Sequence, residues 1–342
     1  MHHDNPDASK GTTQNPGRDV LGELIHAAGR RPNPSSEHYR KTFAATHAVW
    51  QRKLRSARRR QRMFALAASI AIVAIGIGIV LRVIPTGPAP AIAIAAVVHG
   101  DVAAFSADDG EWRPVSSPGF ELRAGDRLRT AGDGGTAFAL GREVSVRLNT
   151  TSELVFVSDS TLELVAGTVY IDSGSGDSGD LEISTPHGRL RDIGTQFEAA
   201  TLTEGLRVRI REGLVQLYRD GGDPAFEGGA GEEFRVDSRG TISQEAFSRH
   251  DPAWEWAEAL AGPPDTDGMP VLEFLNWVSR ETGREILFDG RDVQLAAGSA
   301  ILHGSAQDLT PMDALDVMLA TTNFEYSVRT DGVIVISRRD MR

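Results

Sequence analysis

The sequence of 342 residues contains no cysteine, which excludes disulfide bonds and thiolate sites for zinc or iron–sulfur clusters. Lysine is nearly as rare, since Lys10, Lys41 and Lys53 are its three occurrences and arginine supplies the other basic side chains. We interpret the second absence as a compositional bias without chemical meaning. A chain without cysteine suits an oxidising periplasm but does not require one.

A catalytic constellation is also missing. Carboxylates are abundant, but no spacing singles out a general acid and base pair. His187, Asp192 and Thr195 lie close together in sequence, yet they do not combine a nucleophile with a base and an orienting group. We therefore expect no catalytic, cofactor-binding or metal-binding residues, and we interpret Asp192 and Thr195 as side chains that hydrogen-bond a turn.

Charge is missing from residues 63–81, which read MFALAASIAIVAIGIGIVL. A helix of this length reaches roughly 28 Å, which is close to the hydrocarbon thickness of a bilayer. The alternative is a buried core helix, which needs only about 10 to 14 apolar residues. We expect a transmembrane helix over residues 63–83, with the lipid bilayer as a partner.

Basic residues crowd only the N-terminal flank of this stretch, where Arg58, Arg59, Arg60 and Arg62 stand closest to it. Short basic flanks stay in the cytoplasm, so residues 1–62 are expected inside and the rest of the chain outside. Residues 1–62 hold thirteen Lys or Arg against five Asp or Glu, whereas the remaining residues hold twenty-three against forty-two. The acidic exterior argues against nucleic acid, and topology explains the basic tail better than direct nucleic-acid binding does.

Residues 1–62 are predicted to be partly disordered and partly helical, because residues 1–36 are rich in polar residues, glycine and proline. A short helix is expected over residues 20–28, ending at Gly29. A second helix is expected to begin at Ser36. Its apolar stripe, which should bury against a partner protein or the membrane surface, consists of Tyr39, Phe43, Trp50 and Leu54. A helical continuation of the span is the compatible alternative.

Beyond a proline-rich linker at residues 84–90, the hydrophobic pattern has a period of two. Short runs rich in valine, leucine and isoleucine are separated by glycine, aspartate, serine and proline. This pattern predicts an all-β domain over residues 91–240, built as a sandwich, roll or solenoid. Glycines at the turns between its strands are expected at positions 134, 167, 188, 194 and 213.

The C-terminal third predicts a connecting helix over residues 246–262 and a small α+β domain over residues 263–342. Asp251 and Pro252 suit the start of the connecting helix, and Trp254 and Trp256 should pack against the flanking domains. The last domain is expected to run helix, strand, strand, helix, strand, strand. Thr310 is the expected N-cap of its second helix, and Asp331-Gly332 the expected turn of its final hairpin.

Residues 185–198, TPHGRLRDIGTQFE, closely resemble the signature of the FecR-type periplasmic domain. The residues that carry the resemblance, and which we interpret as structural, are Thr185, Pro186, Gly188, Gly194, Thr195 and Phe197. Two further segments, Leu162-Glu163-Leu164 before the signature and VRIREGLVQL (208–217) after it, also resemble the family and occur in the same order as in its members. The resemblance implies a single-pass protein of the bacterial inner membrane, with a cytoplasmic anti-sigma segment and periplasmic sensing domains.

Residues 263–342 resemble the short secretin/TonB N-terminal domain, on the segments LEFLNWVSRETGREILFD, Leu302-His303-Gly304 and TPMDALDVML. The resemblance implies that this domain meets an outer-membrane TonB-dependent receptor or another envelope protein. An open sheet edge would permit this contact by strand addition.

The predicted fold class is therefore a multidomain membrane protein. It comprises a short helical cytoplasmic segment, one transmembrane helix, an all-β FecR-type domain and a small α+β C-terminal domain. Three functions are open: a regulator of an extracytoplasmic-function sigma factor, a periplasmic binding or scaffold module, and a tethered hydrolase. The first is favoured, although relatives commonly have a longer ordered cytoplasmic segment than the one around Trp50.

Overall fold

The computed structural model describes residues 20–29, 37, 40, 89–141, 144–174, 181–219 and 222–339. The chain divides into two compact units, Met1–Thr86 and Gly87–Arg342. In the first unit the described helix is α1 (Val20–Ala27), and Gly29 follows it with a φ of 66°, which confirms the predicted helix. Three predictions lie outside the described residues: the stripe of Tyr39, Phe43, Trp50 and Leu54, the arginine run, and the span at 63–83.

The fold class expected from the sequence needs correction. Within the described residues, no helix is long and apolar enough to cross a membrane. The longest helix among them, α4 (Val271–Thr282), has 12 residues, whereas a span needs about 20. Its apolar side chains occupy one face and pack into a protein core. The described chain is therefore a mainly β protein with a small α+β part. The prediction of a membrane protein with a transmembrane helix is not supported by the residues that the structure describes.

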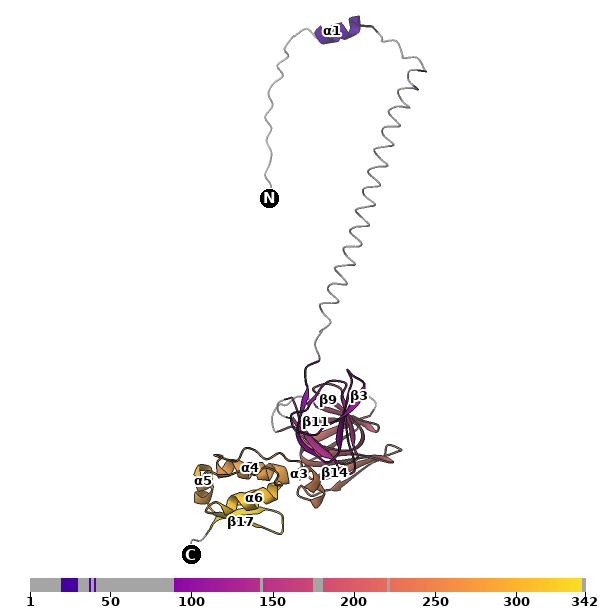
Figure 1. The fold of residues 1–342 in the computed structure, drawn as a ribbon. Coiled ribbons are helices and arrows are strands. Elements are labelled where there is room, and N and C mark those ends of the chain that lie inside the picture. Colours follow the sequence, from indigo (N-terminus) through magenta and orange to yellow (C-terminus); the bar gives the residue numbers. More distant parts are fainter. Residues whose placement is uncertain are drawn as a thin grey trace, which may run out of the picture. The chain divides into compact units, whose positions relative to one another are not determined.

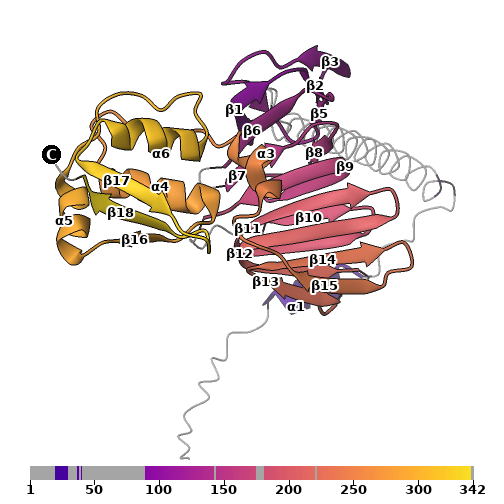
Figure 2. The ribbon, with the colours of Figure 1, turned by 90° about the horizontal axis from the view of Figure 1, so that it is seen from below.

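The β body, defined as residues 89–246, contains fifteen strands in one continuous sheet over the residues that the structure describes. Figures 1 and 2 show it as the strand-rich part of the chain. Its strands are β1 (Ala93–His99), β2 (Val102–Ser106), β3 (Glu111–Pro114), β4 (Glu121–Leu122), β5 (Arg127–Thr130), β6 (Gly135–Leu140), β7 (Val144–Leu148), β8 (Glu153–Phe156), β9 (Thr161–Asp172), β10 (Glu182–Thr185), β11 (Gly188–Leu202), β12 (Gly205–Tyr218), β13 (Phe226–Gly229), β14 (Glu232–Asp237) and β15 (Ile242–Ala246). The prediction of a β-rich central region is confirmed.

Three long strands change partners midway. The first half of β9 pairs with β8 and β10, and its second half pairs with β7 and β11. Strand β11 pairs with β10 before Gly194 and with β9 after it. Strand β12 pairs with β14 before Gly213 and with β13 after it. Strands that pass from one sheet to another in this way form the corners of a folded-over sheet.

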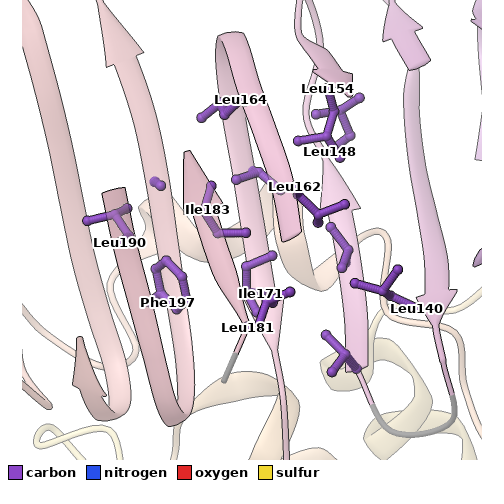
Figure 3. Packing of buried hydrophobic residues seen from close by; sticks show 14 of the residues in the cluster. Leu140, Leu148, Leu154, Leu162, Leu164, Ile171, Leu181, Ile183, Leu190 and Phe197 are labelled. Atoms are coloured by element: carbon purple, nitrogen blue, oxygen red, sulfur yellow. The ribbon is translucent and has the colours of Figure 1, made fainter. Parts of the chain in front are cut away.

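The sheet therefore folds into two layers that share one hydrophobic core, part of which is drawn in Figure 3. The first layer includes β8, β10 and β13, and the second includes β6, β7 and β14. Two ring contacts join the layers directly: Phe138 of β6 lies 4.9 Å from Phe156 of β8, and Phe226 of β13 lies 4.9 Å from Phe234 of β14, measured between ring centroids. Among the predicted alternatives, this arrangement is a sandwich with shared strands.

Three glycines that we expected between strands lie inside them and bend them. Gly167 in β9, Gly194 in β11 and Gly213 in β12 have φ values of 88°, 62° and 78°. A Cβ on Gly213 would overlap the carbonyl oxygen of Gly194 and lie 2.6 Å from Thr195 Cγ2. Glycine is therefore required here both for its φ and for the close approach of two strands.

A connector follows the β body. It consists of the 3₁₀ helix η1 (Pro252–Trp254) and helix α3 (Glu255–Glu258). The Asp251 carboxylate accepts a hydrogen bond of 2.9 Å from the Ala253 backbone N–H, so the predicted cap is confirmed. Trp254 is fully buried and packs edge-on against Tyr170 of β9, at 5.9 Å between ring centroids.

The C-terminal domain, residues 263–339, contains α4, β16 (Ile286–Phe288), α5 (Arg291–Ser299), α6 (Pro311–Ala320), β17 (Phe324–Val328) and β18 (Ile334–Arg338). Its sheet has the order β16-β18-β17, with β16 parallel to β18 and β17 antiparallel. Helices α4 and α6 share a hydrophobic core with one face of this sheet. The predicted cap of α6 is confirmed, since the Thr310 side chain accepts from the Asp313 N–H.

One prediction for this domain is wrong. The second strand expected between the two helices corresponds to the segment ending at Leu302-His303-Gly304. Helix α5 occupies residues 291–299 instead, and only an isolated bridge between Pro270 and Ile301 remains. Val293 and Ala297 of α5, four residues apart, are buried against the core. This short stripe has too few apolar positions to be distinguished from a strand in the sequence.

Candidate functional site

The signature segment forms the β10–β11 hairpin and the bend that follows it. The Thr185 hydroxyl donates 2.8 Å to the Gly188 carbonyl and accepts from the His187 N–H, so this side chain closes the turn that contains Pro186. Phe197 is fully buried in the core of the β body and is labelled in Figure 3. The segment is thus built into the centre of the fold.

The bend at Gly194 is held by polar side chains. The Thr195 hydroxyl donates to the Asp192 carboxylate, and the Thr195 backbone N–H donates 2.9 Å to Ser173 Oγ. Burial raises the pKa of Asp192, against the opposing effect of hydrogen bonds from Ser173 and Thr195. The arrangement joins the residue after β9 to β11 at the point where β11 changes partners. It offers no nucleophile paired with a base, so the geometry is that of a structural bend.

The outer face of the second layer carries charged side chains that alternate with core residues. In β12 the core side chains are Leu206, Val208 and Ile210, and the outward ones are Arg207, Arg209 and Arg211. Alternation of this kind normally marks a face open to water. Here, however, Arg211 has no exposed side-chain surface. The connector and α4 supply partners to this face, as the following contacts show.

Two glutamates of this face illustrate the pairing. Glu198 of β11, which is 1% exposed, accepts 2.9 Å hydrogen bonds from Arg207 and from the indole N–H of Trp256 in the connector. Glu233 of β14, also 1% exposed, accepts from Arg209 at 2.6 Å. Burial would raise the pKa of Glu233, but the hydrogen bonds from Arg209 and Arg235 outweigh burial and lower it.

The tightest set of contacts on this face is the junction cluster, defined as Arg147, Tyr170, Arg211, Glu258 and Glu281. Arg147 donates 2.9 Å to the Ala257 carbonyl and 2.7 Å to the Glu281 carboxylate, with side-chain exposures of 2% and 8% for the ion pair. Arg211 donates to the Glu281 carbonyl and, at 2.7 Å, to Glu258. Two β-body arginines therefore hold the connector and the end of α4.

Tyr170 is the aromatic centre of the junction cluster. The guanidinium carbons of Arg147 and Arg211 lie 5.1 and 5.9 Å from the centroid of its ring, within the range of cation–π attraction. Burial raises the pKa of Tyr170, so its phenol stays neutral. Burial likewise raises the pKa of Glu258, although Arg211 opposes this effect. The cluster can fix the two domains relative to each other, and it presents no group poised for proton transfer.

A second ion pair extends the junction. Arg280 of α4 donates two hydrogen bonds to Asp172 at the end of β9, one of them from Nε at 3.1 Å. Gln196 donates 3.0 Å to the same carboxylate. Asp172 is 6% exposed, and removing the partner of a buried charge leaves that charge without compensation. Among the residues that the structure describes, no group of three or more His, Asp or Glu is placed to hold a metal ion.

Sequence reasoning did not identify the junction. Arg147, Arg211 and Glu281 come from segments far apart in the chain, and only the connector tryptophans indicated a covered face. The structure places the expected signature residues in the hairpin, the bend and the core, all within the β body. It brings none of them into the junction cluster.

Residues 126–216 match the family model for FecR protein, which confirms over this stretch the resemblance drawn from residues 185–198. Two crystal structures, at 2.50 and 1.65 Å resolution, of a proposed anti-sigma factor from Parabacteroides distasonis ATCC 8503 are also similar. They are 15% and 16% identical, have TM-scores of 0.32 and 0.34, and cover 62% and 63% of this chain and 97% and 99% of their own. TM-scores this low do not establish a shared fold. The comparison with curated proteins gives no match.

Proposed function

We propose that this chain, whose residues 126–216 are of the FecR type, is a regulator of an extracytoplasmic-function sigma factor. The observation that supports the proposal is the family match, which runs from β5 through most of β12 and thus covers the strands shared by both layers. In this proposal the β body and C-terminal domain receive a signal. The sigma factor is bound or released by residues 1–62. No catalytic step is assigned to the chain.

The direct test is co-purification of a sigma factor with a tagged fragment of residues 1–62. Phe43→Ala and Trp50→Ala remove bulky groups from one predicted helical stripe, so each should reduce capture at least about tenfold, a loss of about 1.4 kcal/mol. Lys41→Ala, on the opposite side of that helix, is the matched control and should capture as the wild type does. Equal capture by all variants, or none by the wild-type fragment, would refute the proposed role of this segment.

A binding or scaffold module without sigma-factor activity is the alternative. The two differ in a cell-based readout. Deletion of residues 1–50 should change the sigma-dependent response, making it either absent or independent of the signal, if the regulator proposal holds. The response should persist if the chain only binds an envelope component. The proposed location of the β body and C-terminal domain is the periplasm, which rests on the charge asymmetry of the sequence. Reporter fusions at residue 342 test it.

A finer proposal is that the C-terminal domain meets an outer-membrane receptor by strand addition. Strands β16 and β17 are the edges of its sheet, and they expose Leu287 (39%) and Val328 (45%). Because the chain has no cysteine, Val328→Cys creates a unique cross-linking site on the β17 edge. Val317→Cys, equally exposed at 48% but on helix α6, is the control. Receptor cross-links at both sites equally would contradict edge recognition.

A further inference from the structure

A cleft of about 690 Å³ opens beside the junction. Its walls come from three parts of the chain: Glu212 from β12, Arg249 and His250 from the segment before the connector, and Asn276, Arg284 and Glu285 from the C-terminal domain. Clefts of roughly 300 to 1,000 Å³ at a domain junction, with converging polar groups, are the usual setting of small-molecule sites.

The walls of the cleft are held in place. Gly283 has a φ of 63°, and a Cβ there would overlap the Arg249 carbonyl oxygen. Gly332 has a φ of 84°, and its Cβ would lie 2.6 Å from His250 Cδ2. Arg284 donates 3.1 Å to the Gly332 carbonyl. Two glycines thus let the segment of Arg249 and His250 approach the C-terminal domain closely.

Several polar side chains in the cleft make no hydrogen bond or ion pair with the described part of the protein. Over the part of the chain that the structure describes, the side chains of Arg249, His250 and Asn276 make no hydrogen bond or ion pair, and neither do those of Glu212 and Glu285. The cleft therefore presents the Arg249 guanidinium, the Glu285 carboxylate and the Asn276 primary amide without a partner among the described residues, together with the Glu212 carboxylate, which is attracted to Arg280. The amide can both donate and accept hydrogen bonds.

We propose that this cleft binds a short peptide with free ends. Arg249 pairs with the peptide carboxylate, because a guanidinium recognises a carboxylate with two parallel hydrogen bonds. Glu212 and Glu285 bind the ammonium group, and the Asn276 amide bonds to the peptide backbone. A ligand with a single charge would leave either the guanidinium or the carboxylates without a partner. The mixed set therefore favours a zwitterion.

A peptide in the cleft would also lie against the junction, because Arg280 lines the cleft while it is bonded to Asp172. Occupancy would thus bear on the contact between the β body and the C-terminal domain. The binding event itself does not depend on sigma-factor regulation, and it is measured by the peptide alone.

The test is calorimetric titration of the full chain with trialanine, alongside trialanine that is acetylated and amidated at its ends. We expect free trialanine to bind with a dissociation constant below about 1 mM and the capped peptide to bind at least about tenfold more weakly. Arg249→Ala should weaken binding of free trialanine by at least about tenfold. Arg249 is exposed, so this variant should retain the wild-type melting temperature.

Arg239→Ala, an exposed arginine between β14 and β15 and away from the cleft, is the matched control and should bind as the wild type does. Glu285→Gln tests recognition of the ammonium group. It should weaken binding of the free peptide and leave binding of the capped peptide unchanged. Equal binding of free and capped peptides, unchanged binding by Arg249→Ala, or no binding of trialanine at millimolar concentration would overturn the proposal. A failed sigma-factor capture with intact peptide binding would leave this site in place.

Discussion

Arg147 joins the β body to the C-terminal domain through a single buried guanidinium. Its two bonds, to the Ala257 carbonyl and the Glu281 carboxylate, lie where water hardly reaches. Arg147→Met should therefore destabilise the protein by about 3 to 5 kcal/mol, because Glu281 is left buried and unpaired. Urea denaturation measures the change. Arg113→Met is the control, since its ion pair with Asp109 is about half exposed and should be worth about 0 to 1 kcal/mol.

The double variant Arg147→Met/Glu281→Leu separates the interaction between the two charges from the cost of leaving one of them buried and unpaired. Replacing both charges by apolar groups of similar size is often close to neutral. The double variant should therefore be more stable than Arg147→Met alone. A double variant as unstable as the sum of the two single changes would show that the pair itself contributes no coupling.

Asp192 gives the protein a pH dependence of a defined sign. Its pKa is raised above 3.8 by burial, so the folded state keeps a proton that the unfolded state has already released. The contribution of Asp192 to the free energy of unfolding therefore decreases as the pH rises from 3.8 through its pKa in the folded state. Asp192→Asn keeps the acceptor for Thr195 without the charge, so the variant should gain stability relative to the wild type as the pH increases.

Urea midpoints of the wild type and Asp192→Asn between pH of about 3 and about 7 test this difference. Glu233→Gln is the opposite case. The pKa of Glu233 is lowered, so its carboxylate contributes stability above pH 4.5 that is lost as the pH falls. Glu233→Gln should therefore become less stable relative to the wild type as the pH rises. Parallel curves for both variants would contradict the assignment of these shifts.

At the scale of elements, the bends in β9, β11 and β12 decide how the sheet folds over. Gly213→Ala places a methyl group against Gly194 and Thr195 at a φ of 78°. The backbone strain alone should cost about 1 to 3 kcal/mol, and the steric overlap should add to it. Gly119→Ala is a matched control, because Gly119 has a φ of 87° but no atom within 4 Å of the new Cβ. Thermal melts of both variants separate the effect of steric overlap from that of backbone strain. An equal loss of melting temperature in the two variants would contradict a contribution from overlap at Gly213.

The period-two pattern predicted strands because it reports which side chains face the core, but it cannot report which strand pairs with which. It therefore located the β segments, but it does not distinguish the bends at Gly167, Gly194 and Gly213 from turns between strands. Local signals fared better: the caps at Asp251 and Thr310 and the stop at Gly29 depend only on neighbouring residues. Helix α5 was missed because only two of its residues are buried.

The junction could not be predicted for the same physical reason. Arg147 and Glu281 are 134 residues apart, and each alone looks like an ordinary surface charge. A charged strand face is normally a solvated one, and only the covering connector reverses this expectation. The signature segment, in contrast, was recognisable because its turn and bend are made by residues adjacent in sequence.

At the scale of the whole molecule, the β body and C-terminal domain have separate hydrophobic cores and a polar junction. A chain ending at residue 262 should therefore still fold its β body. In that shortened chain Glu281 is absent, so Arg147→Met should cost less than about 1 kcal/mol, against several in the full chain. Calorimetry on the four proteins tests this. An equal cost in both backgrounds would mean that Arg147 acts through the β body and the connector and not through Glu281.

Strands β9, β11 and β12 each belong to both layers, so the layers have a common spine. Neither layer can detach without breaking backbone bonds in the other. Amide protons on the two sides should for this reason exchange with solvent through one shared opening event, at the same rate and with the same response to denaturant.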